Sequence, residues 1–288
     1  MKIWEWYEKV GYRKLMIIPV IILLICIGIL VAQHQVTGEF IKKGMDFKGG
    51  SQLSVDIDNN INVKDLESFL RSRFGDVEVS SAISATGRTL LIRCEENVDE
   101  DELLKSLKDY GLETKSYSFQ KIGASLGESF FSQSVVGITF ALIFMGIVVF
   151  VVFKNFIPSL AVIFAALADM IGALSIMQVL GMELSLASFA GLLMVIGYSI
   201  DTDILLTTRV LKRREGSLRE RIHKSLKTGL TMTFTTLAAL LALYFGSSVR
   251  IFHEIAIVLI ISLLLDIPNT YLMNLGILRW WMERKGIK

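Results

Sequence analysis

The chain has 288 residues, of which 52% are hydrophobic, and its formal net charge is +2. Soluble domains of ordinary composition are less apolar, so the composition favours a membrane protein over a soluble enzyme. A net charge this small gives no indication of a nucleic-acid partner, and the basic residues cluster only beside the apolar segments, so we expect none. His34, His223 and His253 and the two cysteines lie far apart in sequence. We therefore expect no metal site, no other cofactor and no disulfide.

The first long apolar segment covers residues 15–32. As a helix it would extend about 27 Å, which is enough to cross the hydrocarbon core of a bilayer. A cleaved signal peptide is the alternative. Its apolar region would be shorter and small residues would mark the cleavage site, and residues 31–35 lack that pattern.

Residues 33–134 predict a small external domain made of two similar halves. Alternating polar and apolar residues predict strands, and amphipathic segments predict two helices. Asn62 is the expected N-cap of the first helix. The expected order is a strand at 51–57, a helix ending near 74, strands at 77–82 and 89–94 around a turn, a helix at 98–110 and a strand at 113–119. This order suggests a ferredoxin-like α+β domain.

Five further apolar segments follow, at about residues 135–153, 158–179, 184–206, 230–245 and 254–275. The predicted fold is therefore a polytopic α-helical membrane protein with six transmembrane helices and the external domain between the first two. We divide the chain into an N-terminus with the first span (1–32), the external domain (33–134), the remaining spans (135–278) and a tail (279–288).

Lysine and arginine determine the expected orientation in the cell membrane. They gather in the first fourteen residues, in the stretch 209–227 after the fourth span, and in the tail. Segments rich in these residues stay on the cytoplasmic side. We therefore expect both termini to be cytoplasmic and residues 33–134 to be extracytoplasmic.

Four aspartates lie within the predicted spans: Asp169, Asp201, Asp203 and Asp266. A carboxylate at membrane depth costs several kcal/mol, so such residues commonly have a function. Asp201 and Asp203 point about 200° apart on a helix and cannot share one partner. We interpret the four as a proton relay or a buried polar layer. A structural hydrogen bond for Asp169 and a position at the membrane interface for Asp203 remain open.

A glycine-rich motif comprises Gly44, Asp46, Phe47, Gly49 and Gly50. Its glycines permit backbone conformations that other residues resist, so we predict a tight turn that couples the external domain to the bundle. A second motif, at residues 123–127, matches the G-x-S-x-G pattern of hydrolases. It lacks a suitably placed later histidine, so we interpret it as a flexible re-entry into the second span.

These landmarks together resemble the SecF family of membrane subunits of the SecD/SecF protein-export complex. The likeness covers nearly the whole chain and rests on the motifs 44–50 and 123–127 and the threonine-rich run 233–237. It also rests on a fourth-span motif, which comprises Gly197, Tyr198 and Ser199, then Asp201 and Asp203, with Arg209 further on. Two positions depart from the bacterial pattern in a way that looks archaeal. Asp201-Thr202-Asp203 stands where bacterial members read Asn-Asp-Thr, and Thr228 aligns with an arginine.

The resemblance implies a protein-export subunit in the bilayer, with a fold related to RND-type pumps. Its implied partners are a SecD-like subunit, the Sec translocation channel and the translocating polypeptide, and coupling to a proton gradient is implied for bacterial members. No catalytic residue is implied, so we do not expect an enzyme. The alternatives are an RND-type efflux subunit or a structural scaffold of a membrane complex.

Overall fold

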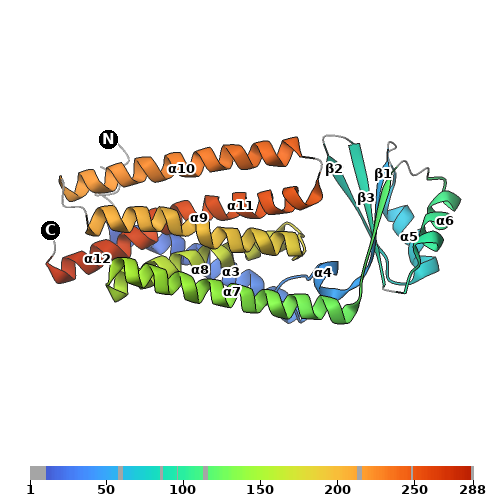
Figure 1. The fold of residues 1–288 in the computed structure, drawn as a ribbon, viewed down its shortest axis with the longest axis horizontal. Coiled ribbons are helices and arrows are strands. Elements are labelled where there is room, and N and C mark those ends of the chain that lie inside the picture. Colours follow the sequence, from blue (N-terminus) through green and yellow to red (C-terminus); the bar gives the residue numbers. More distant parts are fainter. Residues whose placement is uncertain are drawn as a thin grey trace.

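The computed structural model describes residues 11–57, 61–84, 87–95, 97–112, 116–212, 216–247 and 249–286. Within these residues, six helices are long and apolar enough to cross a membrane. They form a bundle with a small sheet domain at one end, and the chain enters and leaves the bundle at the opposite end (Figure 1). The predicted polytopic fold is confirmed.

The bundle is built from helices that cross it six times. Its elements are α2 (Tyr12–Leu15) with α3 (Ile17–Thr37), α7 (Ala124–Phe153), α8 (Phe156–Val179), α9 (Leu186–Leu211), α10 (Leu218–Gly246), and α11 (Arg250–Pro268) continued by η1 (Asn269–Asn274) and α12 (Leu275–Lys285). The last crossing changes its winding after Pro268, where a π-helical segment replaces the α-helix. Proline lacks the N–H group of a regular helix, which accounts for a change at this point.

Several helices are longer than the apolar segments that predicted them. α7 begins at Ala124 and α10 at Leu218, each well before the predicted span. An apolar stretch in the sequence reveals only the part of a helix that lies in lipid. Polar residues can continue the same helix into water. α7 runs through the predicted boundary between residues 134 and 135. The prediction of a flexible segment at residues 123–127 is wrong, because residues 124–127 form the first turn of this helix.

The external domain is a four-stranded antiparallel sheet with two helices. Its elements are a short helix α4 (Met45–Lys48), β1 (Gly50–Ile57), α5 (Val63–Phe74), β2 (Glu78–Ser84), β3 (Gly87–Cys94), α6 (Glu100–Asp109) and β4 (Tyr117–Ile122). The strand order is β2-β3-β1-β4, which is the ferredoxin-like arrangement predicted from the sequence. Residues 85 and 86 of the predicted turn and residues 113–115 of the predicted last strand lie outside the described residues.

Alternation along the strands directs apolar side chains to one face of the sheet. Leu53, Val55 and Ile92 are buried there against Leu66 and Leu103 of the two helices. The α5 helix begins where Asn62 accepts a hydrogen bond from the Lys64 backbone N–H at 3.2 Å. α5 and α6 cover the side of the sheet away from the bundle, so the opposite face is directed towards the membrane helices (Figure 1).

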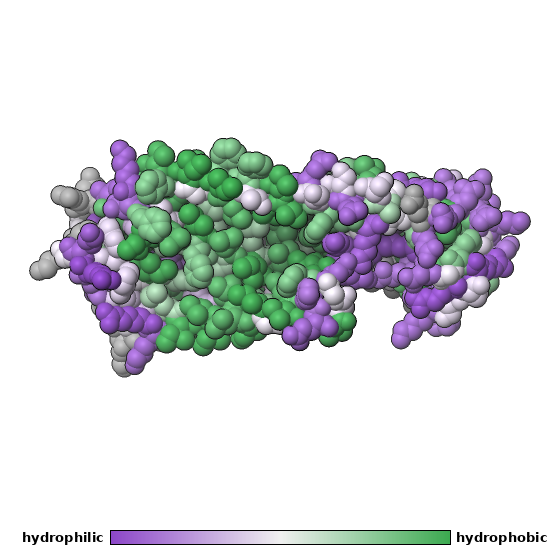
Figure 2. All heavy atoms as spheres, turned by 90° about the horizontal axis from the view of Figure 1, so that it is seen from below, coloured by the Kyte–Doolittle hydropathy of each residue, from purple (hydrophilic) through white to green (hydrophobic). Residues whose placement is uncertain are grey.

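The flank of the bundle is apolar between two hydrophilic ends (Figure 2). Helices α3 and α7 expose large side chains such as Leu24, Ile25, Phe144 and Val151. Exposed surface of this kind is stable against lipid hydrocarbon and costly in water. The two helices therefore form part of the lipid-facing surface.

Glycines allow the coupling motif to touch the start of α7. A Cβ atom at Gly127 would lie 2.9 Å from the backbone nitrogen of Gly49 and 3.0 Å from the carbonyl carbon of Phe47. A Cβ atom at Gly49, whose φ is 81°, would lie 2.6 Å from the Cα of Ala124. The two sequence motifs thus meet backbone to backbone, and larger residues would separate them.

We expect Gly127→Ala to loosen this junction, because over-packing costs about 1–3 kcal/mol. The backbone of Cys94 lies beside the junction, since its carbonyl oxygen is 2.9 Å from the Cβ position of Gly50, and its side chain belongs to the buried core of the sheet domain. Burial raises the pKa of the Cys94 thiol to about 11, so it reacts readily only when that core opens. In a Cys26→Ala background, labelling of Cys94 at constant pH should become at least about fivefold faster. Gly137→Ala is the matched control, since it lies in the same helix with no atom within 4 Å of the added Cβ. Equal labelling rates in both variants would contradict the close packing.

Candidate functional site

The glycine-rich motif at residues 44–50 holds the N-terminal end of α9. The Asp46 carboxylate accepts a hydrogen bond of 2.8 Å from the backbone N–H of Leu186, the first residue of that helix. The backbone N–H of Gly44 donates to the carbonyl of Leu184, also at 2.8 Å. The Phe47 ring is buried against Phe131 of α7 and Phe189 of α9. A displacement of the motif would therefore act directly on α9 and α7.

Charged side chains add a second link between the sheet and the bundle. Lys42 lies 2.8 Å from Glu183 in the α8–α9 loop and 2.9 Å from Glu78 of β2. Arg93 of β3 pairs with the same Glu183. Burial alone would raise the pKa of Glu78, but the hydrogen bond and charge of Lys42, aided by the charge of Arg93, hold that pKa below its usual value. The network therefore favours the ionised carboxylate.

A buried polar layer lies deeper in the bundle, at the level where α8, α9 and η1 meet. Its carboxyl groups are Asp169, Asp203 and Asp266, which are 0%, 0% and 1% exposed. Apolar side chains enclose the layer on both sides, with one buried cluster towards the external domain and another around Leu206 and Leu278 towards the opposite end. The carboxyl groups are therefore separated from bulk water.

Ser199 joins Asp169 to Asp266, and each of the two carboxyl groups has one further donor. The Ser199 hydroxyl of α9 lies 2.5 Å from an Asp169 oxygen and 3.2 Å from an Asp266 oxygen. Asn269 donates to the other Asp169 oxygen at 2.6 Å, and Thr202 donates to the second Asp266 oxygen at 2.9 Å. The single hydroxyl proton of Ser199 serves one carboxyl group at a time.

Thr270 connects this pair to Asp203. Its hydroxyl lies 2.9 Å from Oδ1 of Asp203 and 2.9 Å from Oδ1 of Asp266. Asn274 also donates to Oδ1 of Asp203, at 2.7 Å. The three carboxyl groups therefore form one continuous hydrogen-bonded layer across α8, α9, α11 and η1.

No described Lys, Arg or His forms an ion pair with a carboxyl group of this layer. Adjacent buried carboxylates repel one another, and each is costly to ionise away from water. The layer therefore requires a bound proton or another cation as counter-charge. This requirement is the chemical property that distinguishes the site.

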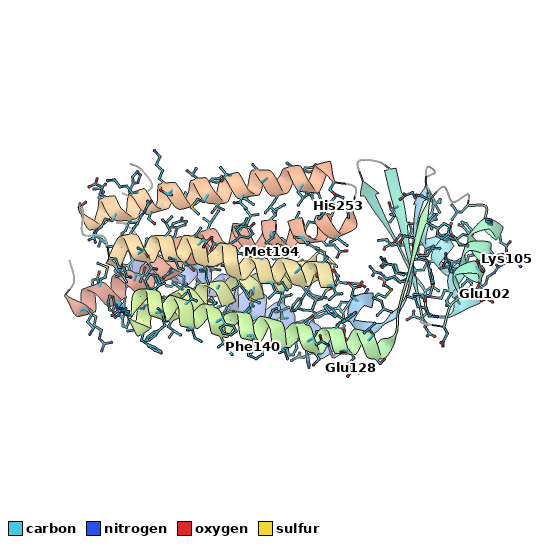
Figure 3. All side chains as sticks on the ribbon, in the orientation of Figure 1. Glu102, Lys105, Glu128, Phe140, Met194 and His253 are labelled. Atoms are coloured by element: carbon cyan, nitrogen blue, oxygen red, sulfur yellow. The ribbon has the colours of Figure 1, made fainter. Side chains whose placement is uncertain are left out.

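The structure divides the predicted fourth-span residues between two faces of α9. Ser199 and Asp203 lie in the buried layer, whereas Gly197, Tyr198 and Asp201 lie on an exposed face. The exposed Met194 marks this face in Figure 3. Asp201 thus does not join the other three acids.

Arg209 lies outside the buried layer, beyond the end of it nearest Asp203. It donates hydrogen bonds to the Lys224 carbonyl at 2.7 Å and to the Thr228 hydroxyl at 2.9 Å.

A narrow crevice with no room for a water molecule lies between α9 and α11 beside Asp266. Tyr198, Ser199 and Ser262 line it together with apolar residues.

Sequence reasoning missed four members of the layer: Thr202, Asn269, Thr270 and Asn274. The last three follow Pro268 inside an otherwise apolar span. Three polar side chains placed directly after a proline at membrane depth would have indicated an internal site.

The comparisons with known proteins agree with this architecture. The family model described as "Protein export membrane protein SecD/SecF, C-terminal" matches residues 102–284. The chain is 40% identical over 286 residues to the protein-export membrane protein SecF of Methanocaldococcus jannaschii, covering 96% of this chain and 98% of that protein. It is 39% identical over 278 residues to that of Methanothermobacter thermautotrophicus, covering 95% and 93%.

Among solved structures, SecDF from Thermus thermophilus, a translocon-associated membrane protein, has the same fold with a TM-score of 0.76 at 20% identity. The match covers 95% of this chain and 38% of that chain. Fold and matches together define a multi-spanning membrane protein of protein export. Within that class, the chain belongs to the SecF family.

We expect Thr270→Val to destabilise the bundle by about 1–3 kcal/mol, because it removes a buried hydroxyl donor that two carboxyl groups share. Thr235→Val is the control, since the Thr235 hydroxyl is exposed and bonds only to the backbone of its own helix. The thermal unfolding midpoint of the purified protein measures both. A midpoint for Thr270→Val equal to that of the control would show that the bridge contributes nothing.

A second expectation concerns Glu78. Its lowered pKa means that the ion network stabilises the folded protein above the usual Glu value of 4.5, and that this contribution disappears as the pH falls through the pKa in the folded state. Glu78→Gln should lower the unfolding midpoint slightly at pH 7, by the equivalent of less than about 1 kcal/mol. The difference from wild type should vanish once the pH falls below the lowered pKa of Glu78 in the folded state. A difference that persists at low pH would rule out the electrostatic origin.

Proposed function

We propose that this chain works with a SecD-like subunit to assist translocating polypeptides at the Sec translocation channel, and that its buried polar layer exchanges protons during this work. Similarity to SecF proteins along nearly the whole chain supports the first part. The second part rests on one observation, which is that three enclosed carboxyl groups share hydroxyl donors without a described cationic partner. Uptake of a proton would supply the missing counter-charge.

The orientation follows from the same proposal. The external domain lies at one end of the bundle, and the start of α2 and the end of α12 lie at the other (Figure 1). The excess of Lys and Arg beside these ends and before α10 favours the cytoplasm for them. The domain would then meet polypeptides that emerge outside.

The exposed face of α9 suits the SecD-like partner. Asp201 lies about 15 Å along the helix axis from the end of α9. An exposed carboxylate at this depth is costly against lipid, whereas a neighbouring helix can offer hydrogen-bond donors. Gly197 lies one turn away on the same face and has no neighbouring atom within 4 Å of its Cβ position, which leaves room for close packing.

Helix α9 would couple the buried polar layer to the external domain. Its first residue is held by Asp46 of the external coupling motif, and Asp203 lies about 25 Å further along the same helix. A change in the protonation of the layer would alter how α9 packs against α8 and η1. A rigid helix would carry that change to the motif and the external domain.

We expect Asp203→Asn to impair export and Asp201→Asn to impair assembly with the SecD-like subunit. Asp203→Asn should reduce export in intact cells at least about tenfold, the effect of losing one well-placed proton-transfer group, and leave co-purification with the SecD-like subunit intact. Asp201→Asn should instead weaken co-purification. Export assays and affinity pull-down of a tagged chain measure the two effects.

Normal export by Asp203→Asn would contradict the proton exchange. Recovery of the chain without a SecD-like protein, together with drug sensitivity on deletion, would favour the efflux subunit. If the chain is only a structural scaffold, export should tolerate the replacement of any buried aspartate, provided that the complex still assembles.

A further inference from the structure

β4 is an edge strand of the external sheet. It pairs with β1 on its inner side, and no strand in the described parts of the chain pairs with its outer side. The strand contains neither proline nor glycine, and it stays in continuous register with β1. An edge without proline or a bulge is a template for pairing with another chain.

The hydrogen-bonding pattern shows which backbone groups of β4 face outwards. The backbone N–H of Asp56 donates to the carbonyl of Ser116, its register partner, at 3.2 Å. Hydrogen-bonded positions alternate along an antiparallel pair, so every second residue from Ser116 turns its backbone groups to β1. The residues between them turn their N–H and C=O groups to the outer edge, and these are Tyr117, Phe119 and Lys121.

The side chains along this edge suit a ligand of varied sequence. Tyr117 is 49% exposed, and its hydroxyl is hydrogen-bonded to Glu100 at the start of α6, which holds the ring beside the edge. Ser118 and Gln120 are exposed on the other face of the strand. Lys121 at the end of the strand carries its only charge. The middle of the edge is therefore neutral and repels neither sign of charge on a ligand.

We propose that the outer edge of β4 binds an extended segment of an unfolded polypeptide by β-strand addition. Affinity in this mode comes from main-chain hydrogen bonds, which every polypeptide can form, so no particular sequence is required. A folded protein keeps its own strand edges paired or covered and offers no such segment. The inference rests on the proposed function and deepens it, because it gives the translocating polypeptide a binding site on this chain.

The position of the edge links such binding to the bundle. β4 leads into α7 with only Gly123 between them (Figure 1). The same start of α7 packs against the glycine-rich motif at residues 44–50. A force on a bound segment would therefore act at the junction between the external domain and the membrane helices.

Hydrogen exchange of the purified full chain with its SecD-like partner tests the site directly. The probe is α-lactalbumin, reduced and carboxymethylated so that it stays unfolded, and its native disulfide-bonded form is the matched control. The amide protons of Tyr117, Phe119 and Lys121 should exchange rapidly in the free complex and at least about tenfold more slowly with saturating unfolded probe. The native form should leave their exchange unchanged.

A pair of variants separates the backbone from the side chain. Lys121→Pro removes one outward N–H group and leaves the hydrogen bonds to β1 in place, since edge strands tolerate proline at outward positions. Lys121→Ala loses the same side chain and keeps the N–H group. The affinity of Lys121→Pro for the fluorescein-labelled unfolded probe, measured by anisotropy, should be at least about fivefold lower than that of Lys121→Ala.

Three results would overturn the site. They are equal affinities of the two variants, unchanged exchange of the three wild-type amides when the unfolded probe is added, and slow exchange of these amides before it is added. The last result would show that another strand of the complex already occupies the edge. None of the three contradicts the proposed function, which fails instead if the chain is recovered without a SecD-like protein.

Discussion

Burial of three carboxyl groups inside an apolar bundle constrains the whole membrane part of this protein. Asp169, Asp203 and Asp266 belong to three different helices, and each needs donors that only the others can bring. A shift of one helix by a single turn would leave several charged or polar atoms unpaired in a medium without water, at several kcal/mol for each. The polar contacts therefore fix how α8, α9 and α11 are aligned along one another. The apolar residues around them add buried surface that depends less on this alignment.

The same helix that carries Asp203 begins at the external domain. α9 has its first N–H group satisfied by Asp46, and Ser185 and Ser188 complete its cap. Glycines at positions 49 and 127 let the motif sit against the start of α7 without intervening side chains. A rigid path thus runs from the sheet to the buried layer.

Much of this architecture could be predicted from the sequence because lipid and water impose simple patterns. Long apolar runs give spans, and alternation gives the strands of the ferredoxin-like sheet. The layer was only partly predictable. Helix geometry required Asp201 and Asp203 to diverge, but which of them turns inward depends on neighbours that a single chain segment does not reveal. Asn269, Thr270 and Asn274 were missed because their partners lie on α8 and α9, far away in sequence.

Asp201 is exposed and Asp203 is buried, which suggests how α9 could serve both subunit assembly and ion exchange. The inward-facing carboxylate of Asp203 is held by fixed donors and, under the proposed function, would exchange a counter-charge. The outward-facing carboxylate of Asp201 would, under the same proposal, find its partner on another subunit. Asp201 and Asp203 are two residues apart, so they lie at nearly the same depth on opposite sides of α9. A change in charge at Asp203 would therefore occur just across the helix from the exposed face that carries Asp201. Assembly and ion exchange would then influence each other through one turn of α9. This arrangement explains why both acids are compatible with a span that would otherwise insert more favourably without them.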